Sequence, residues 1–108
     1  MGRNNVETVD NSAEPDTYQY KAKLYKCNPD IINNRDTLLE VSLQAAADLD
    51  LHVFGHHIQD YPGQGLTGFL ALGESAFVIH TWPEKENFVV IDIDTCSPLV
   101  RLILYPLF

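Results

Sequence analysis

The sequence predicts an α+β domain, a two-layer sandwich in which a mostly antiparallel sheet has a helix packed on one face. Two observations lead to this fold class. One segment with helical periodicity, residues 37–49, follows a first strand-like segment, and strand-like segments joined by short loops make up most of the rest. Strands with short connections pair antiparallel, and a single helix covers only one face of their sheet.

The N-terminal part is expected to hold a tail and a first strand. Residues 1–16 are polar and acidic, without periodicity or the apolar stretch of a signal peptide, which predicts a disordered tail before a single domain of residues 17–108. Apolar and polar residues alternate from Tyr18 to Leu24, the period of a half-buried strand. Asn28-Pro29-Asp30 then predicts a turn.

A helix is expected over residues 37–49. Thr37 and Glu40 have the spacing of a capping box, in which the two side chains accept hydrogen bonds from unpaired amides at a helix start. The apolar residues that follow fall on one helical face: Leu38, Val41, Ala45, Ala46 and Leu49.

Four further strands are predicted at 51–58, 66–72, 75–82 and 88–95. A loop rich in turn residues at 60–65 and a connection at 83–87 separate them. The apolar segment 98–108 is too short for its periodicity to distinguish a strand from a short helix.

The hairpin between the second and third of these strands sets a register. If residues 73–74 form a two-residue turn of type II′, which takes glycine first, then Leu72 lies opposite Ser75. Thr67 then lies opposite His80 on the same pair of strands.

The last hairpin extends this neighbourhood to a third strand. A turn centred near Lys85 places Ser75 opposite Thr95, one residue before Cys96. Ser75 and His80 have opposite parity, so both can point to one site only if the strand begins with a bulge or a distortion.

The composition excludes some classes of protein. A formal net charge of −8 argues against a nucleic-acid partner, and no apolar run reaches the ~20 residues of a membrane span. Cys27 and Cys96 lack CxxC spacing, and nothing indicates secretion, so we expect free thiols in the cytoplasm.

Two groups of polar residues could indicate a specific kind of site. One resembles a metal cluster: Cys27, His52, His56 and His57. Their spacing is not that of zinc ligands, and strand neighbours point to opposite faces, so we expect no metal. The other is Asp92 and Asp94, which share a strand face as a glycosidase carboxylate pair could. Between apolar residues they fit a solvent or interface face better.

Two segments resemble a known family. The stretch GESAFVIHTWPE at residues 73–84 and IDIDTC at residues 91–96 are similar to the prokaryotic S-adenosylmethionine decarboxylases. Members of that family carry Glu-Ser, an apolar stretch, His-Thr-aromatic-Pro-Glu, and a hydrophobic strand ending in Asp-x-x-Thr-Cys. The order of the upstream elements is also similar, so the resemblance covers about residues 18–97.

The resemblance implies a proenzyme that makes its own cofactor. Ser75 attacks the carbonyl of Glu74, and acyl shift, β-elimination and hydrolysis leave a pyruvoyl group on residue 75 of a chain 75–108, with 1–74 as the other product. That group forms a Schiff base with the substrate amine and accepts the electrons released with CO2. The implied enzyme decarboxylates S-adenosylmethionine for spermidine synthesis, as a cytoplasmic homodimer of cleaved units.

The resemblance also implies roles for other residues. His80 matches a histidine that assists the elimination, and Thr67 stands where the family has a serine that helps processing. Cys96 matches the cysteine that returns a proton to the substrate carbon. Tyr61 stands where an aromatic residue stacks on adenine, and Glu84 matches a glutamate that binds ligand.

The chain departs from the family pattern at several positions. Ala76 stands where the family usually has histidine, and Ser97 where it has glycine. The loop after Glu84 is one residue longer, and the family continues beyond the cysteine with a helix and another strand, so we expect a domain that is short on its C-terminal side.

Two alternatives stay open from the sequence. The same cofactor chemistry could act on another amino acid, such as arginine or ornithine. The chain could also be an uncleaved homologue that serves as a binding or regulatory partner, although the joint presence of Ser75, His80 and Cys96 argues against this.

Overall fold

The computed structural model describes residues 17–73, 75–96, 98–99, 104 and 107–108. The predicted tail of residues 1–16 and most of the segment 98–108 lie outside this part. The elements follow one another as β1 (Tyr18–Leu24), α1 (Pro29–Ile32), α2 (Arg35–Asp48), β2 (Val53–Tyr61), β3 (Gly65–Leu72), β4 (Ser75–Trp82), the 3-10 helix η1 (Pro83–Lys85) and β5 (Phe88–Thr95).

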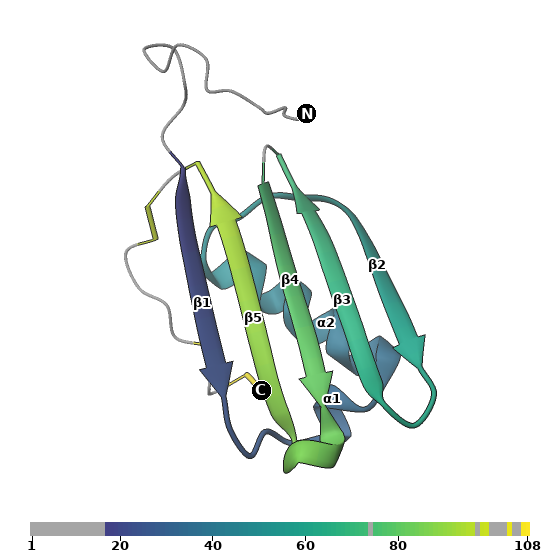
Figure 1. Ribbon diagram of the computed structural model, residues 1–108. Coiled ribbons are helices and arrows are strands. Elements are labelled where there is room, and N and C mark those ends of the chain that lie inside the picture. The colour runs from purple at the N-terminus through teal and green to yellow at the C-terminus, as the bar shows by residue number, and fades with distance from the viewer. Residues whose placement is uncertain (1–16, 74, 97, 100–103, 105–106) are drawn as a thin grey trace, which may run out of the picture.

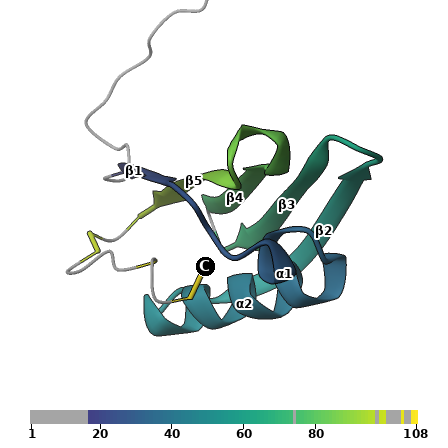
Figure 2. The same cartoon turned by 90° about the horizontal axis from the view of Figure 1, so that it is seen from below.

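The strands form one five-stranded sheet in the order β1-β5-β4-β3-β2, and every neighbouring pair is antiparallel. Figures 1 and 2 show both α-helices on the same face of this sheet. The predicted α+β sandwich is therefore confirmed. Within the described part of the chain, no helix has the length and apolar character needed to cross a membrane.

Helix α2 begins two residues earlier than predicted and has a different cap. The Asn34 side chain accepts a hydrogen bond from the Thr37 backbone amide over 3.0 Å, so the cap residue is Asn34. Asparagine is among the best N-cap residues, and the earlier start adds about half a turn of helix. The capping box predicted for Thr37 and Glu40 is therefore wrong.

The other helix boundaries also have local causes. Residues 28–30 form the start of a helix and not the predicted turn. The Asn28 side chain caps the short helix α1, which begins at Pro29. At the end of α2, Asp50 takes a left-handed conformation, and its amide bonds to the Ala47 carbonyl while the Leu51 amide bonds to that of Ala46. These two bonds form a Schellman motif, which delays the start of β2.

Two predictions about the hairpins need correction. Residues 60–61 belong to β2 and not to a loop, because Tyr61 pairs with Gly65 and only residues 62–64 turn. The φ angle of Gly73 lies outside the positive range, so the turn after β3 is not of type II′. The register predicted from that turn is nevertheless correct, since Leu72 pairs with Ser75.

The core lies between α2 and one face of the sheet. Alternate strand residues point toward α2, and their side chains are fully buried: Phe77, Ile79, Ile91 and Ile93. The opposite face, called the open face below, is covered by no helix among the described residues (Figure 2). It carries Phe69, Val78, Trp82 and Phe88, none of which is fully buried.

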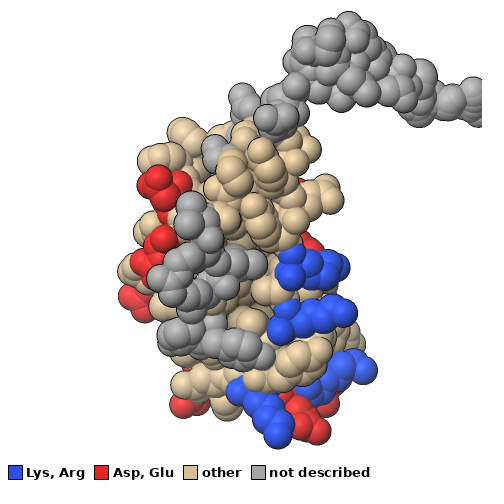
Figure 3. Space-filling model, turned by 90° about the vertical axis from the view of Figure 1, so that its left-hand side faces the viewer, with Lys and Arg blue, Asp and Glu red and all other residues tan. Residues whose placement is uncertain are grey.

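The edge strand β1 gives the acidic protein a basic side. Lys21 and Lys23 are exposed on β1, and the Lys21 ammonium lies 3.4 Å from the Asp92 carboxylate on β5. Figure 3 shows basic side chains in a column on this edge, while most acidic side chains lie away from it. Charged residues on an edge strand discourage pairing with another chain along that edge.

Ser42 provides a test of the core. It lies on α2, is fully buried, and its hydroxyl oxygen has no hydrogen-bond partner among the described atoms. An unpaired buried hydroxyl costs roughly 1–3 kcal/mol. We therefore expect Ser42→Ala to raise the free energy of unfolding by about 1 kcal/mol and the melting temperature by roughly 4–8 °C.

The matched control is Glu40→Ala, which gains similar helix propensity at an exposed position of α2 and should change the stability by less than about 0.5 kcal/mol. Urea unfolding of both variants decides the point. A loss of stability in Ser42→Ala would contradict the description of this core.

Candidate active site

Ser75 lies at the end of the sheet where the β3–β4 hairpin turns. It is the first residue of β4 and pairs with Leu72 without a bulge or register shift. The pairing of Ala76 with Asp94 puts Thr95 opposite Ser75, as predicted. Glu74, the expected cleavage neighbour, lies outside the described residues.

Ser75 and Cys96 line one hollow of about 320 Å³. Cys96 follows the last residue of β5 and is half-buried. The other residues of the lining come from the ends of β3 and β5 and from the segment that enters β2: Asp50, Leu51, His52, Phe54, Leu72, Gly73 and Thr95. The structure thus brings together the predicted reactive serine and the predicted proton donor.

Thr67 and His80 form a second pair, on the open face of the sheet. They lie opposite each other on β3 and β4, and the Thr67 hydroxyl oxygen is 3.2 Å from Nδ1 of His80. Both side chains are partly buried. The hydroxyl can therefore orient the imidazole, since it can donate a hydrogen bond to Nδ1 or accept one from it.

Tyr61 lies beside this pair. It lines a hollow of about 270 Å³ together with Thr67 and His80. Gln64 and Trp82 line the same hollow, and the Trp82 and His80 rings are 5.8 Å apart between centroids. Gln64 and Trp82 were not predicted as site residues, although the position of Trp82 two residues after His80 already indicates the same strand face.

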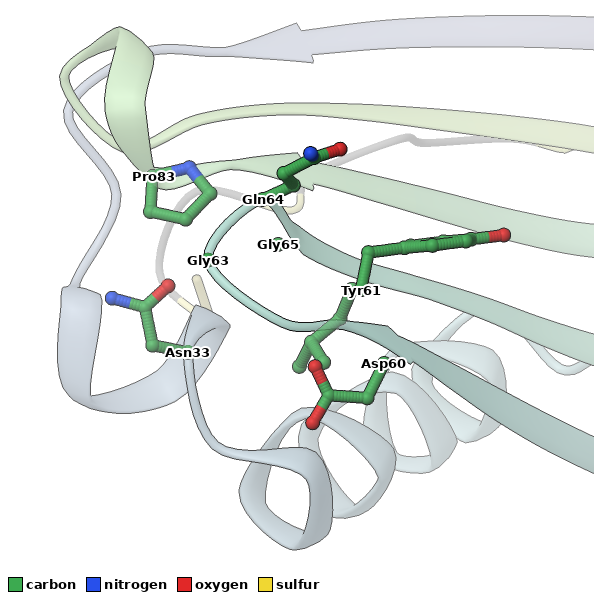
Figure 4. Close-up of a pocket in the computed structure, with 8 residues that line it drawn as sticks. Asn33, Asp60, Tyr61, Gly63, Gln64, Gly65 and Pro83 are labelled. Atoms are coloured by element: carbon green, nitrogen blue, oxygen red, sulfur yellow. The ribbon is translucent and has the colours of Figure 1, made fainter.

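A third hollow, of about 320 Å³, adjoins the β2–β3 turn (Figure 4). Asp60 and Tyr61 enter it from the end of β2, and in Figure 4 their side chains point in different directions, that of Asp60 toward α2. A side chain at Gly65 would collide with the backbone oxygen of Thr81, and its φ of 106° also requires glycine. Gly65 therefore lets β3 approach β4 closely where Tyr61 is held.

Glu84 lies on η1, immediately after β4, and is exposed. It is at the end of β4 that carries Trp82, opposite to the end that carries Ser75. Its carboxylate can therefore reach a ligand near Tyr61 and His80, but not one near Ser75 of the same chain.

The predicted site residues consequently fall into two groups. Ser75 and His80 are five residues apart on a regular strand, a separation of about 16 Å, and they belong to opposite faces. A bulge or distortion at the start of this strand would be needed to aim both side chains at one point. The described pairing of β4 contains neither.

His56 and His57 on β2 belong to neither of these two groups, and they form no metal site with the other described residues. His56 and His57 are exposed, and the His57 ring nitrogen Nε2 lies 3.2 Å from the Gln59 side-chain oxygen. No set of three or more His, Cys, Asp or Glu side chains in the described segments is arranged to hold a metal ion.

A solved structure shares this fold. The crystal structure of the adenosylmethionine decarboxylase from Aquifex aeolicus matches with a TM-score of 0.68 and 27% sequence identity, over 80% of this chain and 70% of that chain. The shared fold defines a decarboxylase of the two-layer α+β class, and in this chain Ser75 begins β4 while Cys96 follows β5.

Sequence comparison makes the assignment specific. The family model for S-adenosylmethionine decarboxylase matches residues 18–102, and the chain belongs to this family. An S-adenosylmethionine decarboxylase proenzyme of Clostridium botulinum is 35% identical over 80 residues, which are 74% of this chain and 68% of that protein. A proenzyme of the same name from Caldicellulosiruptor saccharolyticus is 30% identical over 79 residues, 73% and 63% of the two proteins.

The two cysteines differ in environment, which gives a test of the site. Cys27 is buried, and its burial raises the pKa of the thiol because the thiolate is poorly solvated there. The thiolate is the reactive form, so a raised pKa together with burial slows alkylation. We expect iodoacetamide near pH 8 to modify Cys96 in the native protein and Cys27 only after unfolding.

Peptide mass mapping after timed alkylation measures this difference. A Cys96→Ser variant serves as the control and should remain unlabelled while folded. Labelling of Cys27 before Cys96 would show that the hollow beside Ser75 is closed to small molecules.

Proposed function

We propose that this chain cleaves itself before Ser75, carries a pyruvoyl group on that residue, and decarboxylates S-adenosylmethionine. Its product would donate aminopropyl groups in spermidine synthesis. The observation that carries the proposal is the common hollow of Ser75 and Cys96, directly beside the hairpin that contains the expected cleavage bond. A reducing cytoplasm suits the reaction, since it keeps Cys96 a thiol.

Processing needs a hydroxyl at residue 75 and a base. The Ser75 Oγ attacks the carbonyl carbon of Glu74, the peptide C–N bond breaks, and an ester with a free amine on residue 75 results. Removal of the Cα proton of residue 75 then expels the Glu74 carboxylate from Cβ. The remaining enamine tautomerises, takes up water and loses ammonia, which leaves the ketone of the pyruvoyl group.

The residues fit this group. Residue 75 is half-buried at a strand end, so a ketone there would be accessible to an amine from the adjoining hollow. The pyruvoyl group supplies a carbonyl that binds the substrate amine and accepts the electron pair left by CO2. Cys96 is the proposed proton donor to the substrate carbon, a role that a thiol with a pKa of ~8.5 can fill near neutral pH. Tyr61 and Glu84 of a second chain are proposed to hold the adenosyl part, because in their own chain they lie at the end of β4 opposite to Ser75.

A homodimer is part of the proposal, because one chain separates the two groups. The proposed base, His80, is about 16 Å from Ser75 along β4, so it cannot reach the Cα proton of residue 75 in its own chain. The open face carries a set of large apolar side chains that a second copy would cover: Phe69, Val78, Trp82 and Phe88.

The geometry of such a dimer is constrained. One cross-strand row runs over the open face from β1 to β2 and contains Lys21, Asp92, Val78, Phe69 and His57. This row crosses β4 between Ser75 and His80. A two-fold axis along it stacks β4 antiparallel on its copy, so that the strand ends that carry Ser75 and Cys96 in one chain lie over Thr67 and His80 of the other.

The proposed cleavage before Ser75 can be tested directly. Denaturing mass spectrometry of the purified protein should give two fragments, the larger ending at Glu74 and the smaller blocked to Edman sequencing. Ser75→Ala should remain one uncut chain and release no CO2 from S-adenosylmethionine, because no ketone can form. Ser42→Ala, which changes a serine outside the site, should cleave fully.

Carbon dioxide release should be measured with S-adenosylmethionine, arginine and ornithine in parallel. A wild-type chain that stays intact after long incubation would contradict the proposed processing. Release from arginine or ornithine alone would assign the same chemistry to a different substrate.

Complementation between two inactive variants tests whether the site is shared between two chains. Ser75→Ala lacks the reactive serine and His80→Ala lacks the proposed base, so each is expected to be inactive alone. Co-expressed in equal amounts, they should regain about a quarter of the wild-type activity, because half of a random dimer population is mixed and each mixed dimer has one complete site.

Mass spectrometry of the mixture should show cleavage of the His80→Ala chains only. Sedimentation should give a dimer for both variants alone and for the mixture. Dimers that form without any regained cleavage or activity would contradict a site completed by the second chain.

A further inference from the structure

Phe54 is the most exposed of the large apolar side chains in the described part of the chain. Its exposed fraction is 78%, compared with 59% for Tyr25, 47% for Tyr61 and 42% for Phe69. A ring that is this exposed contributes little to the core. Its location is therefore of more interest than its packing.

A β-bulge sets the direction of this ring. Val53 pairs with Leu72 and Gly55 pairs with Ala71, so Phe54 has no opposite residue in β3. The pairing is regular from Gly55 to the end of β2. A bulge of this kind turns a side chain out of the alternation that it would follow in a regular strand.

The bulge brings Phe54 to the hairpin that precedes Ser75. The Cε2 atom of its ring lies 3.7 Å from the position that a Cβ atom on Gly73 would take, which is ordinary van der Waals contact. Phe54 also lines the hollow that contains Ser75 and Cys96. Leu51 and Leu72 line it as well, so one wall of the hollow is apolar.

We propose that Phe54 is a substrate-positioning residue whose ring forms the apolar wall against which the hydrocarbon chain of the substrate lies. The inference rests on the function proposed above. In S-adenosylmethionine, two methylene groups separate the carbon that bears the amine from the sulfur. When the amine reaches residue 75, these methylenes must lie within a few bond lengths of it, beside Phe54. Contact with the ring removes apolar surface from water and fixes the chain.

Phe54→Ala, Phe54→Leu and Glu40→Ala test this role. Glu40 is an exposed residue on α2, away from both the hollow and the open face, and Glu40→Ala serves as the control. Each purified variant is analysed by denaturing mass spectrometry for cleavage, by CO2 release for kcat and KM, and by thermal unfolding. Calorimetric titration with decarboxylated S-adenosylmethionine gives a Kd that does not depend on turnover.

We expect Phe54→Ala to cleave fully and to melt close to the wild type. Its KM and its Kd for the product should both rise about tenfold, the usual effect of losing one apolar contact in a pocket, while kcat stays within about twofold. Phe54→Leu, which keeps an apolar wall, should restore most of the loss, and Glu40→Ala should behave as the wild type.

Unchanged KM and Kd in Phe54→Ala would overturn the inference. An equal rise in Glu40→Ala, or a rise in Phe54→Ala accompanied by a melting temperature several degrees lower, would overturn it too, because the effect would then be structural. A wild-type protein that neither cleaves nor releases CO2 overturns the proposed function instead, and the wild-type titration distinguishes the two cases.

Discussion

The continuous antiparallel register of β4 is the constraint on which the arrangement of this protein depends. β4 pairs with β3 from Ser75 to His80, and with β5 from Ala76 to Trp82. Because strand side chains alternate, this register fixes the face of every residue between them. It buries Phe77 and Ile79 under α2 and turns His80 toward the open face. The core and the separation of the site residues therefore have one cause.

The same register explains why the fold could be predicted from the sequence. The strands have clear period-2 patterns, and the connection centred near Lys85 fixed the pairing of β4 with β5. The register of the β3–β4 hairpin was predicted correctly from a two-residue turn, even though Gly73 does not adopt the predicted turn type. Loop length determines register more strongly than turn geometry does.

Other features depended on competition that a single sequence does not resolve. Asn34 and Thr37 are both good caps, and the structure uses Asn34. Ser75 and His80 already have opposite parity in the sequence, but only the structure shows that β4 pairs without the bulge that would aim both at one site. Phe54 reads as an ordinary strand residue, because a bulge leaves no mark in its periodicity.

The strand order has a consequence for the two products of the proposed cleavage. The fragment before residue 75 contains β1, β2 and β3, whereas the fragment after it contains β4 and β5, which lie between β1 and β3. The shorter piece is thus a two-stranded insert, hydrogen-bonded along both of its edges to the longer piece. Scission of one peptide bond would leave both ladders intact, and the nicked sheet could separate only by unzipping on two sides at once.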